Sequence, residues 1–208
     1  MNKKNELNFK LIKNPYYYPF YRKYFKKIYN TSLVIVWRNS KTRENKYLIQ
    51  KRSKNMKRGK NKLAIGGGML EKSDKTLQAG AIREVLEESQ IQFRKNNNLS
   101  KETIKLLEPY LFPLKTDKNN LTFFLIIVSK KQPKVNGPLK TDKIKPFLKS
   151  EREIDVEDKL WDNKRLEGRI KNGHAFLNKK EIFYHYKKGL ELWKYAKDSL
   201  NLIFDILE

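Results

Sequence analysis

The feature that most constrains this chain is a triple glycine followed by a helix that carries several carboxylates. The glycines at 66–68 end a short apolar run, and the segment 77–89 has the periodicity of an amphipathic helix. Within it, Glu84, Glu87 and Glu88 are three and four positions apart, so they share one helical face. Stacked carboxylates repel one another, and a divalent cation offsets this because Mg²⁺ and Mn²⁺ prefer oxygen ligands. A glycine turn beside an acidic helix face therefore predicts a metal site.

The composition excludes several other kinds of site. The 208 residues include no cysteine, which excludes disulfides, thiolate metal sites and cysteine nucleophiles. The two histidines, His174 and His185, leave little room for a zinc site or a histidine-based triad. No apolar run reaches the roughly 18 to 20 residues that span a membrane, and the start of the chain does not resemble a secretory signal. We therefore expect a cytoplasmic protein without a membrane partner.

The net charge of +24 has two competing explanations. A polyanionic partner such as nucleic acid would account for it, and so would the coding bias of an AT-rich genome. The distribution of charge is more informative, because no acidic residue lies between Glu44 and Glu71 while basic residues are frequent there. This basic block leads directly into the glycines, so it is expected to overhang the metal site. Arg52 and Lys62 are its candidates for binding the phosphates of a ligand.

Apolar and β-branched runs mark the expected strands, which are 32–37, 46–52, 62–65, 121–128 and a short one around 159–161. The C-terminal segment 179–207 has helical periodicity and forms one helix or two. Strands and helices alternate with hairpins, which predicts an α+β fold with a mixed central sheet between helices, an α/β/α sandwich with helical N- and C-terminal extensions. The expected division is an arm at 1–30, a domain at 31–165 and a helical extension at 166–208.

The N-terminal arm is rich in aromatic and basic residues, and 21–29 within it could form a short helix. Its rings could stack on nucleic-acid bases while its lysines contact phosphates. Alternatively, the rings pack over the core and the lysines stay solvated. We favour the second interpretation.

The segment from Gly67 to Ile91 resembles a Nudix box. That family's pattern is a glycine, five residues, Glu, seven residues, Arg-Glu, an aliphatic residue, any residue, Glu-Glu, any residue, a glycine and an aliphatic residue. The stretch 83–88, Arg-Glu-Val-Leu-Glu-Glu, matches the second half of the pattern. The loop departs from it, because Lys75 stands where the pattern has Glu. A single inserted residue would put Asp74 in that acidic role.

The resemblance implies a Nudix fold and hydrolysis of a nucleoside diphosphate linked to another group, with Mg²⁺ or Mn²⁺ as cofactor. It assigns the metal to Glu84, Glu87 and Glu88. Arg83 would orient the loop by pairing with an acid, for which Glu71 is the first choice.

The remaining site residues follow from the same resemblance. Gly67 and Gly68 would let the backbone approach the phosphates. The catalytic set would comprise Arg83, Glu87 and Glu88, together with a general base. That base is Glu88 itself, or Glu151 or Glu153 in a later loop.

The substrate is left open among three hypotheses. The first is the 5′ cap of RNA, since the basic surface could track an RNA backbone. The chain is similar in size and plan to the decapping Nudix enzymes of large DNA viruses such as poxviruses, which is compatible with a viral origin. The second is a small nucleotide such as ADP-ribose, a dinucleoside polyphosphate or a damaged nucleotide. The third is a Nudix-fold module that binds a nucleotide or RNA without catalysis.

Overall fold

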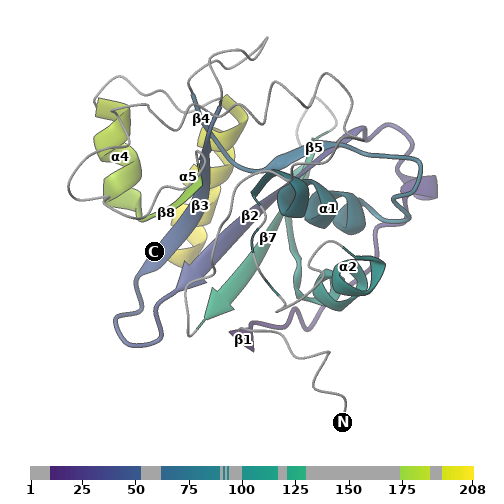
Figure 1. The fold of residues 1–208 in the computed structure, drawn as a ribbon, viewed down its shortest axis with the longest axis horizontal. Helices are drawn as coiled ribbons and strands as arrows, with labels where there is room; N and C mark the ends of the chain where they lie inside the picture. Colours follow the sequence, from purple (N-terminus) through teal and green to yellow (C-terminus); the bar gives the residue numbers. More distant parts are fainter. Residues whose placement is uncertain are drawn as a thin grey trace.

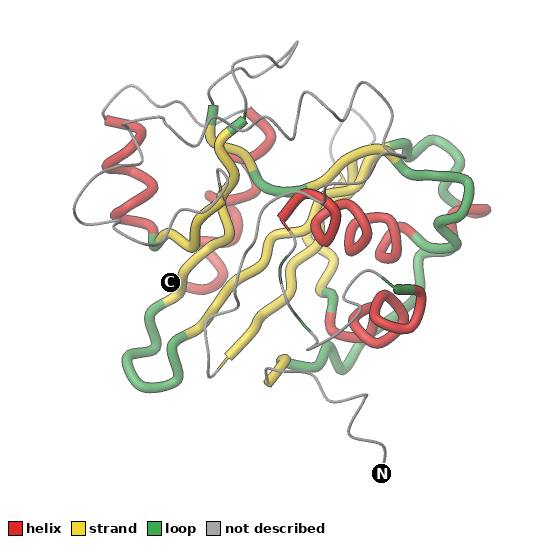
Figure 2. Tube along the Cα trace, in the orientation of Figure 1, coloured by secondary structure: helices red, strands yellow, loops and turns green. Residues whose placement is uncertain are grey.

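The structure is a computed structural model that describes residues 10–52, 62–89, 91, 93, 100–116, 121–129, 174–187 and 194–208. These residues form an eight-stranded mixed sheet with helices on both faces. Figure 2 shows the strands in yellow between two groups of red helices. None of the helices in the described part of the chain has the length and apolar character needed to cross a membrane.

The elements follow one another along the chain in an interleaved order. They are β1 (Lys10–Leu11), the 3₁₀ turn η2 (Arg22–Tyr24), β2 (Asn30–Arg38), β3 (Asn45–Lys51), β4 (Leu63–Ala64), β5 (Gly67–Met69), α1 (Leu77–Ser89), α2 (Lys101–Leu107), the 3₁₀ turn η3 (Glu108–Tyr110), β6 (Phe112–Thr116), β7 (Leu121–Ser129), β8 (His174–Leu177), α4 (Lys179–Lys187) and α5 (Lys194–Leu207).

The centre of the sheet is the parallel pair of β2 and β7, which are hydrogen-bonded along their whole length. On its other edge, β2 pairs with β3 only at its C-terminal end, where Val36 lies opposite Tyr47. The two strands then separate, and the chain at 63–69 enters the opening between them. It pairs first with β3, as β4, and then with β2, as β5. This split places the glycines of β5 beside the N-terminal end of β2.

Alternate residues of the central strands point to opposite faces, so the sheet has two apolar cores. The core under α1 and α2 includes Leu33, Ile35, Phe124, Ile126, Leu77, Ala81, Ile82, Val85 and Leu86. The core under α4 and α5 includes Val34, Val36, Phe123, Leu125, Ile127, Ile182, Leu200, Ile203 and Phe204. Figure 1 shows the two helix pairs on opposite faces of the sheet. The expected α/β/α sandwich with a mixed sheet is confirmed.

Most of the expected elements are present, and the differences have physical reasons. The helix 77–89 is found with those bounds, and the C-terminal segment forms two helices. The helix expected at 21–29 is wrong, because only the three residues of η2 are helical. On either side of η2 the backbone pairs elsewhere, through the bridge of Tyr21 with Thr76 and the hydrogen bond from the N–H of Leu70 to the backbone oxygen of Tyr29. The expected glycine turn is also wrong, since Gly67 and Gly68 belong to strand β5. The strand expected around 159–161 lies outside the described residues.

Both ends of the described chain join the same sheet. Strand β1 pairs with β7, and β8 pairs with β3. The side chains of α5 complete the second core. The described residues outside 31–165 are thus packed as integral parts of the sandwich.

Candidate functional site

Strand β5 brings two glycines into close contact with α1. The backbone N–H of Gly67 donates a hydrogen bond to Oε2 of Glu88 at 3.1 Å. Gly67 has a φ of 152°, and a Cβ there would lie 2.4 Å from the backbone oxygen of Thr31. A Cβ on Gly68 would lie 2.4 Å from Oε2 of Glu84. Gly67 is therefore required so that the strand can lie against β2, while the absence of a side chain at Gly68 leaves room for the carboxylate of Glu84.

The start of α1 is fixed by Thr76. Its Oγ1 accepts a hydrogen bond from the N–H of Ala79 at 3.0 Å, as an N-cap residue does, and it donates to Oε1 of Glu108. Burial raises the pKa of Glu108, although its hydrogen bonds with Thr76 and Tyr17 oppose this rise. The cap links the helix to η3 and sets where the acidic face begins.

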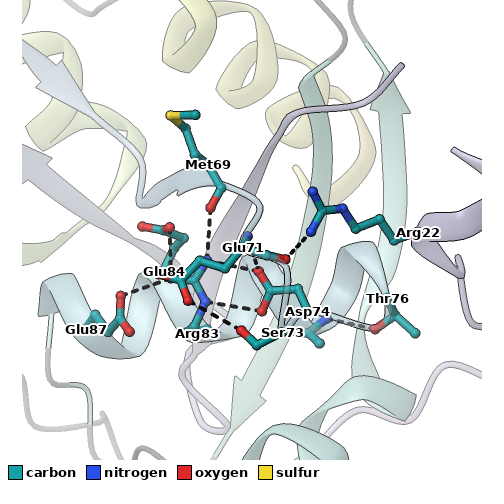
Figure 3. Close-up of polar contacts among 10 residues, drawn as sticks. Arg22, Met69, Glu71, Ser73, Asp74, Thr76, Arg83, Glu84 and Glu87 are labelled. Atoms are coloured by element: carbon teal, nitrogen blue, oxygen red, sulfur yellow. Dashed lines mark hydrogen bonds and ion pairs between the residues drawn. The ribbon is translucent and has the colours of Figure 1, made fainter. Parts of the chain in front are cut away.

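Arg83 is the centre of the site, and Asp74 is its main partner (Figure 3). The Arg83 Nε donates to Oδ1 of Asp74 at 3.2 Å, and Nη2 donates to Oδ2 at 3.0 Å. Nη2 also donates to the backbone oxygen of Met69 at 2.9 Å, while Oδ2 of Asp74 accepts the N–H of Glu71 at 2.8 Å. The expected pairing with Glu71 is reduced to a single ion pair of 3.7 Å. Asp74 thus joins the loop to Arg83, and its role as the acid of the family pattern stays a prediction.

The third nitrogen of Arg83 faces the carboxylates of its own helix. Nη1 lies 3.0 Å from Oε1 of Glu84 and 3.1 Å from Oε2 of Glu87. Burial alone would lower the pKa of Arg83, but the hydrogen bond to Asp74 and the nearby carboxylates raise it above its ordinary value. Burial raises the pKa of Glu87, and the charge of Arg83 opposes that rise without cancelling it.

The donor chemistry of this face fits a hard divalent cation. Four carboxylates share the single guanidinium of Arg83, so the site holds more negative than positive charge. As placed, no group of three or more His, Asp or Glu side chains in the described residues converges on a point that a metal ion could occupy. Glu84 and Glu87 turn toward Arg83, and Glu88 turns toward Gly67. These carboxylates could hold a metal after rotating away from those partners.

For Arg52 and Lys62, the structure shows a backbone contact between the two residues. The N–H of Arg52 donates to the backbone oxygen of Lys62 at 2.9 Å, so both residues lie just beyond the paired ends of β3 and β4. Lys46, from the same basic block, is buried, and its Nζ lies 5.9 Å from the centre of the Trp37 ring. Residues 53–61, Glu151 and Glu153 lie outside the described residues. The roles proposed for Arg52, Lys62 and Glu153 stay predictions.

The N-terminal arm supplies contacts that sequence reasoning missed. The guanidinium of Arg22 donates to the backbone oxygen of Glu71, as Figure 3 shows. Gln78 accepts from the N–H of Phe20 and donates to the backbone oxygen of Tyr18. No local pattern could have revealed these pairs, because their partners are far apart in the chain.

The sequence model of the NUDIX domain matches residues 29–166. The chain belongs to the Nudix family. No protein with a curated function matches this chain in sequence. The resemblance of the segment from Gly67 to Ile91 to a Nudix box is therefore confirmed at the level of the family.

Several solved structures are similar to this Nudix chain at low sequence identity. The NUDIX domain of Shewanella oneidensis NrtR complexed with ADP ribose has 9% identity and a TM-score of 0.49 over 88% of this chain and 89% of that chain. The MERS1 protein of T. brucei has 14% identity and a TM-score of 0.47 over 76% and 60%. The Nudix hydrolase RenU of M. smegmatis has 10% identity and a TM-score of 0.45 over 86% and 85%.

Proposed function

We propose that this Nudix chain is a metal-dependent pyrophosphohydrolase whose substrate is the 5′ cap of RNA. The observation that carries the proposal is the buried Arg83, which joins the loop through Asp74 and the helix through Glu84 and Glu87. That arrangement holds several carboxylates against a glycine strand, where phosphates could approach the backbone. If these carboxylates rotate away from their present partners, a metal and a pyrophosphate could be bound together here.

Glu84, Glu87 and Glu88 are the residues that would hold the metal. Bound Mg²⁺ or Mn²⁺ would neutralise pyrophosphate charge and lower the pKa of a coordinated water. Arg83, held by Asp74, keeps the loop and helix at a fixed separation. Glu88 is our candidate general base because Gly67 orients its Oε2, and Glu153 is the alternative.

The choice of capped RNA is supported by charge. A net charge of +24 suits a long polyanion better than a small nucleotide. If coding bias is the source of this charge, ADP-ribose, a dinucleoside polyphosphate or another small nucleotide becomes the substrate. A non-catalytic binding module is the third candidate, favoured by the engagement of Glu84 and Glu87 with Arg83.

The test is a product assay on capped RNA, ADP-ribose and diadenosine polyphosphates in parallel, with Mg²⁺ and with Mn²⁺. We expect the wild type to hydrolyse a phosphoanhydride of the cap, releasing the cap nucleoside as its diphosphate and leaving RNA with a 5′-monophosphate, and we expect Glu87→Gln to lose this release. Asp198→Asn is the matched control, since Asp198 is exposed on α5, on the opposite face of the sheet.

Three results would contradict parts of the proposal. Undiminished release by Glu87→Gln would show that the metal ligands are wrongly assigned. Cleavage of the small nucleotides but not of capped RNA would identify a small-nucleotide pyrophosphatase. Failure to bind either metal at millimolar concentration would favour the binding module.

A further inference from the structure

The N-terminal arm is fixed to the loop and helix of the Nudix box. The N–H of Leu77 donates to the backbone oxygen of Phe20 at 2.9 Å, and the side chain of Gln78 bonds to the arm on both of its polar atoms. The N–H of Arg22 donates to the backbone oxygen of Lys75 at 3.0 Å. The surface formed where arm and loop meet is thus set by backbone hydrogen bonds.

The rings of the arm are divided between the core and the surface. Phe20 and Phe25 pack against the core under α1, with the ring of Phe20 centred 5.9 Å from that of Phe124. The tyrosines instead face outward, as Tyr24 does with 67% of its surface exposed and Tyr21 with 43%. The favoured expectation, that the rings cover the core, holds for the phenylalanines and is wrong for these tyrosines.

An open pocket of about 630 Å³ lies between the arm and the loop. We call it the arm–loop pocket, and it is lined by Tyr21, Arg22, Lys23, Lys26, Lys72, Asp74 and Lys75. Five of these seven side chains are cationic. The charge of the one carboxylate, Asp74, is already engaged by Arg83. The pocket is therefore strongly attractive to an anion.

We propose that the arm–loop pocket binds a single-stranded RNA segment, with the lysines on phosphates and Tyr21 and Tyr24 stacked against bases. The ligand is inferred from the combination of charge and rings, because single-strand binders pair a basic groove with exposed aromatic side chains. A duplex would offer its phosphates but would keep its bases stacked away from the rings. The choice of RNA over DNA rests on the proposed function.

The two tyrosines form a small aromatic cluster at the arm–loop pocket, in which Tyr21 lines the pocket and Tyr24 packs beside it. Their ring centres are 6.4 Å apart at an interplanar angle of 80°, so the edge of one supports the other. The Nζ of Lys23 lies 4.8 Å from the centre of the Tyr24 ring and 6.0 Å from that of Tyr21. A phosphate at Lys23 would therefore bring its neighbouring base within reach of both rings.

The position of the pocket links RNA binding to the Nudix box. Asp74 lines the pocket and also makes both hydrogen bonds to Nε and Nη2 of Arg83. Lys72 and Lys75 are exposed on either side of Asp74 in the same loop. An RNA held here would lie directly beside the segment that carries the acidic face.

The contribution of the pocket lysines is tested by measuring the affinity for a 5′-hydroxyl oligouridylate of twelve nucleotides in EDTA. Fluorescence anisotropy over a series of salt concentrations gives this affinity. The pocket variant carries Lys→Gln at Lys23, Lys26, Lys72 and Lys75. The matched control removes the same charge from exposed lysines elsewhere, at Lys41, Lys101, Lys180 and Lys197. We expect the pocket variant to bind at least tenfold more weakly, and its log–log salt slope to fall by about 0.7 for each phosphate that the protein no longer neutralises. Equal weakening in both variants would show that binding follows net charge alone and would overturn the inference.

The rings are tested separately with Tyr21→Leu and Tyr24→Leu, which keep bulk but remove the aromatic face. Each should weaken binding of the oligouridylate about fivefold or more. Phe183→Leu on α4 is the control and should leave the affinity unchanged, since that ring is on the opposite face of the sheet. Wild-type affinity in both tyrosine variants, or equally tight binding of duplex RNA, would contradict single-strand recognition.

These measurements can be separated from the proposed hydrolysis. The oligouridylate has no cap and EDTA removes metal, so binding is read without catalysis. Hydrolysis of a cap dinucleotide by the wild type, which has no RNA body to bind in the pocket, tests the proposed function alone. If the protein fails to bind the oligouridylate, hydrolysis of the cap dinucleotide can still be interpreted, and the reverse also holds.

Discussion

The ion pair between Asp74 and Arg83 leads to the sharpest prediction about this Nudix box. Replacing Asp74 by Asn keeps the shape of the side chain but removes its charge. In the wild type, Nε and Nη2 of Arg83 donate to the two carboxylate oxygens of Asp74 at 3.2 and 3.0 Å. In the variant, an amide N–H₂ would replace one of these acceptors. We expect the variant to be less stable and to lose the geometry of the loop.

The size of the effect follows from burial. The two side chains are only 4% and 9% exposed, so water cannot replace the lost partner. Breaking a buried pair in this way typically costs about 3 to 5 kcal/mol. Because Arg83 keeps Glu84 and Glu87 at Nη1, we expect roughly 3 kcal/mol, the lower end of that range. For a chain of this length, that corresponds to a fall in Tm of roughly 6 to 12 °C.

Urea unfolding and thermal melting measure this cost, and a second variant tests the register of the loop. Asp74→Asn combined with Lys75→Glu moves the acid to the position that the family pattern uses. Lys75 is exposed and lines the arm–loop pocket, so a carboxylate there faces away from Arg83. We expect no recovery of stability in the double variant.

Two outcomes would refute this reasoning. If Asp74→Asn unfolds within 1 kcal/mol of the wild type, about the value of an exposed ion pair, the pair is not buried as described. If the double variant regains most of the loss, position 75 can reach Arg83 and the register is wrong. Lys41→Gln, on an exposed turn, serves as the control for unrelated effects on folding.

Three further predictions concern the same region. Gly68→Ala should displace the flexible Glu84 carboxylate and weaken metal-dependent activity about 10- to 100-fold, with little loss of stability. Gly67→Ala should instead lower the free energy of unfolding in urea by roughly 1 to 3 kcal/mol, because the φ and the backbone contacts at this position suit only glycine. Burial raises the pKa of Glu87, so the free energy of unfolding of the metal-free protein should fall as the pH rises from the ordinary carboxyl range through that raised pKa. In Glu87→Gln, unfolding measured across the same pH range should show no such fall. Thr76→Ala should cost about 1 to 2 kcal/mol by removing the helix cap, and Thr76→Ser should restore most of it; equal stability of the two variants would contradict the capping role.

The sequence could predict the elements whose signal is local. The helix at 77–89 has a clear apolar stripe, and the strands at 32–37 and 121–128 are long β-branched runs, so their bounds agree with the structure closely. Strand β6 was missed because it contains Pro113. Strand propensity counts proline against a strand, although an edge strand tolerates it. Strand β5 was missed because paired glycines favour a turn unless a neighbouring strand supplies hydrogen bonds.

The shared helical face of the candidate carboxylates was predictable from the sequence, and the pairings of Arg83 were less so. The spacing of Glu84, Glu87 and Glu88 placed them on one side of α1, as the structure has them. Which acid holds Arg83 depended on burial, since the side chain of Glu71 is 58% exposed and that of Asp74 only 4%. The contacts of the arm with the loop join residues far apart in the chain, and no periodicity encodes them.

The parallel pairing of β2 with β7 has a consequence for how this protein is made. The Nudix box and α2 lie between these two strands in the chain, and α1 packs its apolar stripe on both of them. At about 5 to 20 residues per second, the ribosome needs on the order of ten seconds to reach β7 after β2 has emerged. During that interval α1 can pack on β2 but not yet on β7, and the non-local parallel pairing of the two strands is slow to form. The acidic face is thus assembled late in folding, and a nascent chain stalled before β7 would expose the apolar side of α1.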